Sequence, residues 1–567
     1  MAVGKDVEIL RHAMKSVVDE MFETLRRTAY SPNIKTRMDC TCGLFDPEGR
    51  NLAQNDEFPM HIGALVELVP GHVANRGDDL GPGDGLLVND PAKNHTHLPD
   101  VTLISPLYHD EDLAGYAATL AHHVDIGGPT AGGIPTDVTE TYGEGLVLPG
   151  VKAVEDWTYN DEVMSIVLRN VRDPDRRHGD YLAQLGANRT AESRLGEVIT
   201  DRGWAAVGAE AERLYDYTER LVRDAIQSIP DGRYSAEDYM DGDGVVDEPV
   251  KLALTLIIDG DTITVDFTGT ADQNQGPLNI TPAGVLSGIM PVLMSFLGTD
   301  IPKNDGFYRP IDLITPPGTM VNPEENVPVA GWAEPKNRVG DLISKAMAGA
   351  LPEKTIAGTK GSCQQWSVDG QDPATGSEFV YYESFGGGYG ARATKDGMDA
   401  VQTNSQNTAN ASIEELETHY PFLITRYELI PDSAGAGRTR GGLGLRRDMQ
   451  VNATDGRLVV NSDRMRFAPW GLFGGDEGTP ARYAINDEAL PSSKITRSLD
   501  RGDQVSIRTP GGGGYGDPHE RDAEAVRRDV VQGKVSREAA REEYGVVVTT
   551  RGEIDEQATA RLRGDSQ

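Results

Sequence analysis

The sequence predicts a multi-domain α+β protein, with mixed sheets packed against helices and a Gly-rich, β-rich C-terminal part. Three observations lead to this fold class. The chain has 567 residues, which is more than one hydrophobic core accommodates. Its apolar pattern changes from helical spacing to strand alternation along the chain. Glycine clusters late, in runs such as TPGGGGYGDP, which we interpret as turns of a β-rich domain whose backbones approach closely.

Helices dominate the first predicted unit. Asp6 to Thr28 places apolar side chains at helical spacing with charges on the other face, and Asp6 is suited to cap this helix. Helical spacing resumes at Asp161 and ends at Pro230-Asp-Gly232. Between these blocks, apolar runs such as Val101 to Leu107 predict strands. We therefore assign residues 1–232 to one N-terminal domain.

Strand alternation begins after residue 232. The segments KLALTLIIDG and DTITVDFTGT meet at an Asp-Gly-Asp turn, which predicts a β-hairpin. Later changes of pattern give further boundaries. The predicted units are an N-terminal domain at 1–232, a β-rich domain at 233–330, a mixed α/β segment at 331–430, a Gly-rich β domain at 431–516 and a charged helical tail at 517–567.

The net charge of −35 excludes two classes of partner. Such an acidic surface repels nucleic acid and anionic membranes, and an acidic, halophile-like surface that stays hydrated in salt is the simplest explanation. No run approaches the roughly 20 apolar residues of a membrane span, and the first residues lack the apolar core of a signal peptide. With three cysteines in no disulfide-like framework, we expect a cytoplasmic protein.

Histidine and aspartate cluster between Leu86 and Gly128. His97-Leu-Pro-Asp100 comes directly before the predicted strand Val101 to Leu107, and His122-His123-Val-Asp125 follows a second apolar run. If the two strands are neighbours, both clusters lie at one edge of a sheet. Imidazole and carboxylate ligands are typical of a catalytic divalent metal. Spacing alone leaves open whether these histidines bind a metal or are buried core residues.

Asp39 is a second candidate outside this stretch. It lies among small and apolar residues, where a carboxylate should be paired or bound. Considered by itself, an ion pair with Arg37 or another arginine is the simpler interpretation. His61 is either a residue that supports a metal site or a hydrogen-bonded core histidine. The chain has no G-x-x-x-x-G-K-[ST] motif, so we expect no P-loop for ATP.

Together these motifs resemble the hydantoinase B/oxoprolinase family over nearly the whole chain. That family includes B subunits of ATP-dependent N-methylhydantoinases, 5-oxoprolinases and caprolactamase, and it is related to the large subunits of acetone and acetophenone carboxylases. The matching segments include Arg37-Met-Asp39-Cys-Thr-Cys-Gly, Thr96-His-Leu-Pro-Asp100-Val-Thr, Ala121-His-His-Val-Asp-Ile-Gly-Gly128, Gly179-Asp-Tyr-Leu-Ala-Gln184, Tyr382-Glu-Ser-Phe-Gly-Gly-Gly388 and Gly511-Gly-Gly-Gly-Tyr-Gly516.

The resemblance implies one divalent metal, zinc or manganese, in this chain. The positions matching the family's ligands are Asp39, His97, Asp100 and His122. His123 and Glu144 are the candidates for proton transfer. The chain departs from the family pattern at Lys93-Asn-His95 and at Gly132-Gly-Ile134, both of which we expect near the mouth of the site.

The resemblance also implies a reaction and a partner. ATP is expected on a hydantoinase A-type partner, which phosphorylates a hydantoin, 5-oxoproline or lactam, and the B-type chain then hydrolyses the activated intermediate. The expected assembly is a hetero-oligomer that acts on a small cyclic amide. Two alternatives stay open at this point: a subunit of an ATP-dependent ketone carboxylase, and a non-catalytic structural subunit with a vestigial site.

Overall fold

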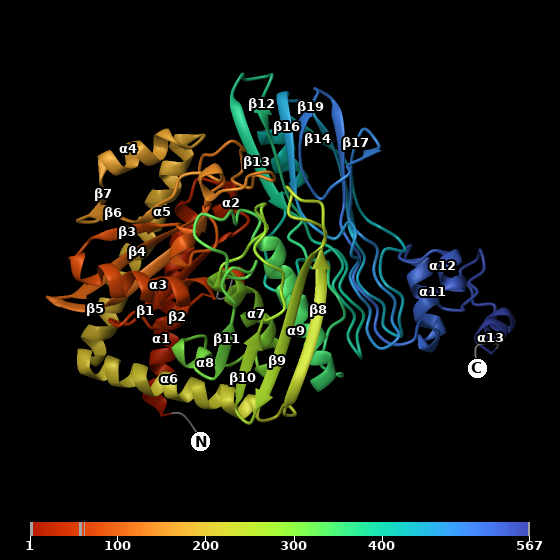
Figure 1. Cartoon of the computed structure of the whole chain (residues 1–567), viewed down its shortest axis with the longest axis horizontal. Helices are drawn as coiled ribbons and strands as arrows, with labels where there is room; N and C mark the ends of the chain where they lie inside the picture. The colour runs from red at the N-terminus through yellow and green to blue at the C-terminus, as the bar shows by residue number, and fades with distance from the viewer. Residues whose placement is uncertain (1–3, 56–58, 62, 565–567) are drawn as a thin grey trace.

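A computed structural model describes residues 4–55, 59–61 and 63–564 of the chain. The N-terminal strands and helices form one side of the molecule, the middle of the chain lies beneath and beside them, and the C-terminal sheets form the other side (Figure 1). This arrangement is the mixed α+β architecture of several sheets that the sequence predicts, with four sheets in the described residues.

The N-terminal sheet carries the predicted His/Asp clusters. It has seven antiparallel strands in the order β2-β1-β5-β4-β3-β6-β7. Their bounds are β1 Cys40–Phe45, β2 Asn51–Gln54, β3 Gly85–Val88, β4 Asp100–His109, β5 Asp112–His122, β6 Pro149–Glu155 and β7 Thr158–Tyr159. The two strands that the clusters flank are therefore neighbours, and their register sets Asp100 opposite His122.

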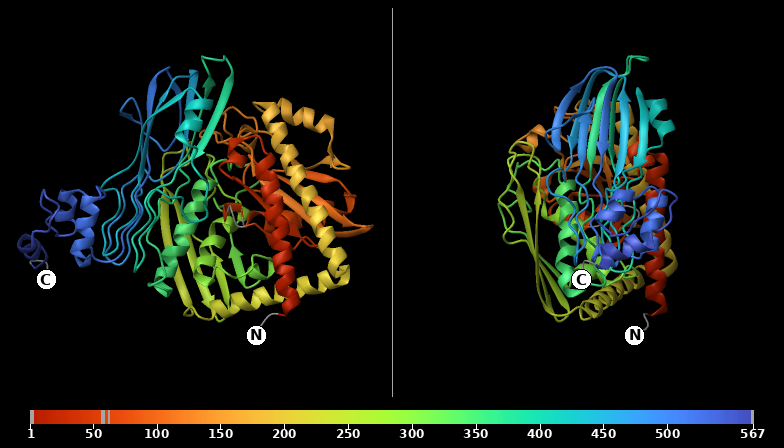
Figure 2. Two further views of the ribbon diagram at one scale, coloured as in Figure 1. Left: turned by 180° about the vertical axis from the view of Figure 1, so that it is seen from behind. Right: turned by 90° about the vertical axis from the view of Figure 1, so that its right-hand side faces the viewer.

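Helices cover both faces of this sheet. Apolar side chains of α1 (Lys5–Thr28) and α5 (Pro174–Arg202) share one core with β1 and β5. These two long helices lie side by side in the view from behind (Figure 2). The other face packs on α3 (Ala64–Arg76), and α2 (Pro32–Lys35), α4 (Asp161–Arg169) and α6 (Trp204–Ile226) complete the layer. The predicted N-terminal helix and the helical block from Asp161 are confirmed.

The middle of the chain forms a four-stranded sheet backed by helices. The strand order is β11-β10-β9-β8, with bounds β8 Gly232–Met240, β9 Val250–Asp259, β10 Thr262–Asp266 and β11 Ile311–Ile314. β9 and β10 form the predicted hairpin. Buried faces of α7 (Pro282–Leu297) and α9 (Ala333–Ala350) share the core of this sheet, and the short α8 (Asp305–Tyr308) lies against α6.

Two antiparallel sheets make the C-terminal part, with orders β13-β12-β16-β19 and β14-β15-β20-β17-β18. The strand bounds are β12 Gln365–Gln371, β13 Glu378–Ser384, β14 Phe422–Leu429, β15 Leu445–Val451, β16 Thr454–Asn461, β17 Arg482–Ile485, β18 Glu488–Ala489, β19 Lys494–Leu499 and β20 Asp503–Arg508. One apolar core joins the two sheets. The remaining helices are α10 Ile413–His419, α11 Ala523–Val531, α12 Arg537–Glu542 and α13 Glu556–Gly564, with short 3-10 turns η1 Pro59–His61, η2 Gly77–Asp79, η3 Pro91–Lys93, η4 Thr141–Gly143 and η5 Pro518–Glu520.

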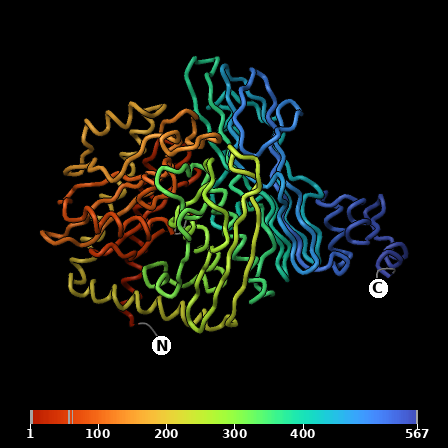
Figure 3. The backbone as a smooth tube through the Cα atoms, viewed as in Figure 1, coloured from red at the N-terminus to blue at the C-terminus, as the bar shows by residue number. Residues whose placement is uncertain are grey.

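Glycine-rich segments near 386–397, 435–444, 471–478 and 511–516 lie against one another between these sheets and the terminal helices (Figure 3). The Gly512 amide donates to the Gly442 carbonyl at 2.9 Å, and a Cβ on Gly512 would lie 2.2 Å from the Tyr389 oxygen. Only glycine allows backbones to approach this closely. The predicted close approach is confirmed. Turns lie at 393–394 and 473–474 within these segments, and between the turns the backbone runs mostly extended (Figure 3).

Each helix in the described part of the chain is too short or too polar to cross a membrane. The unit boundaries drawn from the sequence stay a prediction.

Candidate metal centre

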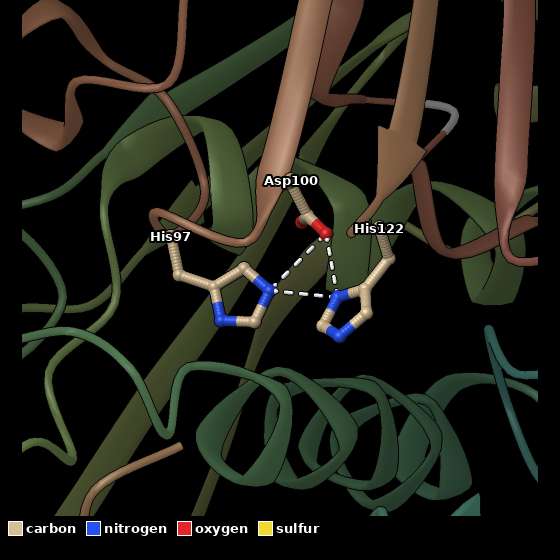
Figure 4. A group of neighbouring side chains, drawn as sticks. All are labelled: His97, Asp100 and His122. Carbon is tan, nitrogen blue, oxygen red and sulfur yellow. Dashed lines mark hydrogen bonds and ion pairs between the residues drawn. The ribbon is translucent and has the colours of Figure 1, made fainter. Parts of the chain in front are cut away.

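Three predicted ligands meet where β4 begins and β5 ends. Asp100 is the first residue of β4 and His122 the last residue of β5, while His97 lies in the loop that leads into β4. Antiparallel pairing joins the start of one strand to the end of the other, so residues 22 positions apart become neighbours. Figure 4 shows the three side chains pointing toward one another.

The converging atoms are His97 Nε2, Asp100 Oδ1 and His122 Nδ1. Asp100 Oδ1 lies 3.1 Å from His97 Nε2 and 3.0 Å from His122 Nδ1, and the two nitrogens are 3.2 Å apart. Bonds of about 2.0–2.2 Å to a divalent metal would set its ligand atoms about 3 to 3.5 Å apart, which this spacing matches. All three side chains are buried.

Neighbouring groups orient these ligands. His97 Nδ1 lies 3.0 Å from the Ala330 carbonyl oxygen, which can only accept, so Nδ1 carries the proton. In this tautomer the Nε2 lone pair faces the Asp100 carboxylate. Thr96 donates its hydroxyl proton to the other oxygen of Asp100 at 2.6 Å. Two electron-rich atoms held face to face in a buried site are the donor set that a cation stabilises.

Electrostatics keep Asp100 ionised. Burial acts to raise the pKa of its carboxyl, but His97, His61 and His122 hold that pKa well below the ordinary value. His61 Nε2 lies 3.6 Å from the second oxygen of Asp100. Burial lowers the pKa of His61 to about 4, so this imidazole is neutral near pH 7. The group therefore contains an ionised carboxylate with the neutral His61 imidazole beside it, and a deprotonated carboxylate is what a divalent metal requires.

Asp39 lies directly before β1 and next to this group. Its carbonyl oxygen accepts from the His122 amide at 3.0 Å, and its carboxylate accepts from Asn33 at 3.4 Å. Its charge also acts on His61. Among the described residues, the group of converging side chains is His97, Asp100 and His122, so Asp39 lies beside it.

Arg37 was a candidate ion-pair partner of Asp39, but the structure gives it other contacts. Its guanidinium donates to the Asn33 side chain, to the Tyr382 carbonyl at 2.9 Å and to the Ser384 hydroxyl at 3.1 Å. These contacts tie the N-terminal domain to β13. In the ranges that the structure describes, no ion pair joins Arg37 to Asp39.

His123 lies between the strands and α5. Its Nε2 is 3.0 Å from Gln184 Oε1, and its ring stacks on Tyr181 with centroids 4.3 Å apart. Gln184 donates its amide protons to the carbonyls of Val101 and Thr119. Burial lowers the pKa of His123 to about 4. The structure therefore brings His123 to the helix side of the sheet, apart from the three converging ligands.

Glu144 is linked to the ligand His97 through the backbone of Ala330. Its Oε1 accepts from the Ala330 amide at 2.6 Å, and the Ala330 carbonyl accepts from His97. Burial raises the pKa of the Glu144 carboxyl to about 8, against the opposing effect of the Ala330 and Val329 amides. Its Oε2 has no hydrogen-bond partner in the described structure. The carboxyl is therefore protonated near pH 7 and adjacent to a ligand.

The family model for hydantoinase B/oxoprolinase matches residues 5–518 of this chain. The chain belongs to the hydantoinase B/oxoprolinase family. A protein of Pseudomonas sp. (strain NS671), provisionally named as the B subunit of a D-/L-hydantoinase, is 35% identical over 98% of this chain and 97% of its own length.

Two solved structures share the fold of this family member. The crystal structure of ATP-dependent caprolactamase from Pseudomonas jessenii contains a chain with a TM-score of 0.89 and 29% identity, over 98% of this chain and 99% of that one. A nucleotide-free acetone carboxylase structure gives a TM-score of 0.92 at 20% identity, over 99% of this chain and 82% of that one. The second likeness shows the fold alone.

Aromatic residues from later in the chain close over the ligands of this family member. The Tyr382 ring stacks on His122 with centroids 5.1 Å apart, and the edge of Trp332 meets His97 at 5.7 Å. The sequence pattern did not identify Trp332 as part of the site, because Trp332 lies 235 residues from His97 and contacts it only through tertiary packing. Tyr382 belongs to a family motif, although no role followed from that.

One expectation about the mouth of the site is wrong. His95 was expected at the mouth, but it is buried, with Nε2 2.9 Å from the Thr102 hydroxyl and Nδ1 3.1 Å from Thr96. Burial lowers its pKa to about 3. His95 therefore supports the loop that holds His97 and Thr96.

Proposed function

We propose that this chain is the metal-dependent B subunit of an ATP-dependent cyclic amide hydrolase. The family membership and the similarity to the named B subunit of a D-/L-hydantoinase and to an ATP-dependent caprolactamase support this activity. The observation that carries it is the buried convergence of His97, Asp100 and His122 at the end of two paired strands.

The proposed reaction has two steps. A partner of the hydantoinase A type binds ATP and phosphorylates the amide oxygen of a hydantoin, 5-oxoproline or lactam. In this chain, water attacks the activated imidate carbon, and the ring carbon–nitrogen bond breaks to give an amine and an acyl phosphate. A second water then releases phosphate from the acyl phosphate and leaves the carboxylic acid. The relative named as a B subunit supports a heteromeric assembly.

One divalent metal, zinc or manganese, fits the site. His97, Asp100 and His122 would hold it, with Asp39 as the fourth ligand from beside the group. When bound, the metal supplies Lewis acidity that makes water a better nucleophile near neutral pH. The Ala330 carbonyl keeps the His97 lone pair directed at the site, and Thr96 orients Asp100.

Glu144 is the stronger of the two candidates for proton transfer. With a pKa of about 8 its carboxyl exchanges a proton near neutral pH, as an efficient acid–base group should. His123 donates to Gln184 and is packed on Tyr181, so a catalytic role would require it to act through neighbours. We propose that Glu144 holds the proton released or needed during ring opening.

The test is co-expression with the A-type partner, followed by metal analysis and an ATP-hydrolysis screen over 5-oxoproline, hydantoins, lactams and ketones. The hydrolase predicts one metal per chain and ATP consumption coupled to ring opening. His97→Ala should remove the metal and the coupled reaction. His109→Gln, at the opposite end of β4, is the matched control and should change neither.

The two alternatives give different results in the same screen. A ketone carboxylase subunit would require bicarbonate and a ketone for ATP consumption. A structural subunit with a vestigial site would purify without stoichiometric metal. Either result would replace the proposed hydrolase.

A further inference from the structure

Lys336 is a buried lysine whose amine has no hydrogen-bond partner among the residues that the structure describes. It lies in the first turn of α9, and its side chain has 0% exposure. Within the described residues, no acceptor reaches its Nζ, which lies 5.8 Å from the centroid of the Trp332 ring. Burying an unpaired charge is costly, so lysines are rarely enclosed without a partner. A buried titratable group of this kind, next to a proposed active site, is a candidate for binding a ligand.

Other buried lysines of this protein are fully supplied with acceptors. Lys360 donates to the Phe385 carbonyl at 2.6 Å and to the side chains of Gln402 and Gln406. Lys494 pairs with Asp463 at 2.9 Å. Lys336 therefore differs from these two lysines, because no acceptor in the described part of the chain reaches its amine, although all three are enclosed.

The charged groups around Lys336 are already engaged. Glu334 accepts from the Ser362 hydroxyl and from the Cys363 amide. Asp39 accepts from Asn33. Burial lowers the pKa of Lys336 to about 7, while Cys363, Glu334 and Asp39 act to raise it and Lys360 acts to lower it. The amine is thus close to its protonation midpoint and ready to become charged beside an anion.

Lys336 also lies next to the candidate metal centre. The Trp332 ring over which its Nζ sits meets the His97 ring edge at 5.7 Å. Its charge acts on His61, which contacts Asp100. The strands supply the proposed metal ligands, and the start of α9 places the unpartnered Lys336 amine over the Trp332 ring that packs on His97.

We propose that Lys336 binds an oxyanion of the substrate held at the candidate metal centre, namely a phosphoryl oxygen of the activated amide. This inference rests on the proposed function, since that reaction delivers a phosphorylated intermediate to this chain. A phosphoryl group carries charge that a buried ammonium neutralises through a charge-assisted hydrogen bond. A substrate carboxylate offers the same oxyanion chemistry, and the experiment separates the two sources.

Lys336→Met removes the charge and keeps much of the side-chain volume. If Lys336 serves a ligand, the variant should melt at the same temperature as the wild type or higher, because an unpaired buried amine is lost. If Lys336 instead stabilises the fold, the variant should melt lower. Lys345→Met is the matched control, since Lys345 lies on the same helix and donates to the Glu237 carbonyl.

The binding experiment uses the metal-loaded full chain without the A-type partner. Inorganic phosphate and 5-oxoproline are titrated separately by calorimetry into the wild type and both variants, and metal content is measured in each. We expect Lys336→Met to weaken phosphate binding by about tenfold or more with unchanged metal content. Lys345→Met should bind phosphate like the wild type.

Three results would overturn the inference: no phosphate binding by the wild type, equal binding by Lys336→Met, or a lower melting temperature of that variant. Loss of 5-oxoproline binding alone would overturn the phosphoryl assignment. Failure of the proposed function is separate, because it would show as absent ring opening with the partner while phosphate binding still depends on Lys336.

Discussion

Replacing Glu144 with glutamine should stabilise the protein at neutral pH and remove part of its pH dependence. The Glu144 side chain is 1% exposed, and burial raises its pKa to about 8 from an ordinary 4.5. For an acid whose folded pKa is raised, the stabilising contribution is present below about pH 4.5 and is lost as the pH rises through about 8. Glutamine keeps the oxygen that accepts from the Ala330 amide and never ionises.

The size of the effect follows from these two pKa values. Between pH 5 and pH 7, linkage through Glu144 alone lowers the unfolding free energy of the wild type by about 2.5 kcal/mol. Glu144→Gln lacks this loss. The difference in unfolding free energy between variant and wild type should therefore shift in favour of the variant by about 2.5 kcal/mol over that interval. Urea unfolding of both proteins at the two pH values measures it.

Glu383→Gln is the control, since it makes the same replacement at another buried carboxylate. Glu383 accepts from the Arg447 guanidinium at 2.6 Å. Replacing this carboxylate leaves Arg447 buried without a counter-charge. The unfolding free energy should therefore fall by about 3 kcal/mol at both pH values. A stability difference for Glu144→Gln that stays constant from pH 5 to pH 7 would refute the assignment of a protonated carboxyl.

Three further predictions concern the metal, the glycine-rich segments and helix α6. Asp100→Asn should lower metal affinity at least tenfold, measured by metal analysis after dialysis, because it removes the one carboxylate of the converging group; retention of full metal would contradict the site. Gly512→Ala should markedly lower the urea midpoint, since its Cβ would lie 2.2 Å from the Tyr389 oxygen, and an unchanged midpoint would count against the packing described. Gly208→Ala, exposed in α6 with nothing within 4 Å of its Cβ, should raise stability by about 0.5–1 kcal/mol, and a loss would show that the helix is misassigned.

Local patterns predicted several of the elements. The apolar spacing of α1 and the Asp-Gly-Asp turn between β9 and β10 depend on residues close in sequence, so both predictions are confirmed. The arrangement of the glycine-rich segments was predicted only in part. Its close backbone approach follows from composition, but the extended course of the segments depends on partners such as Tyr389 and Gly442.

Some residues of the candidate site were found from the sequence, and others only in the structure. His97, Asp100 and His122 were accessible from the sequence because two neighbouring strands flank them, and strand pairing is local enough to predict. Asp39 entered through family resemblance, and its ligand role stays a prediction. His61 was noted without a role, and Trp332 and Lys336 were not found.

By itself, the sequence determined the family, the long N-terminal helices, the β9–β10 hairpin, the two strands that flank the His/Asp clusters, and the residue types that suit a divalent metal. Only the tertiary structure decided which neighbours act on them. Antiparallel register joins Asp100 to His122, the Ala330 carbonyl selects the His97 tautomer, and burial raises the pKa of Glu144. Hydrogen-bond partners and desolvation depend on atoms that are close in space but separated by hundreds of residues, so spacing along the chain cannot specify them.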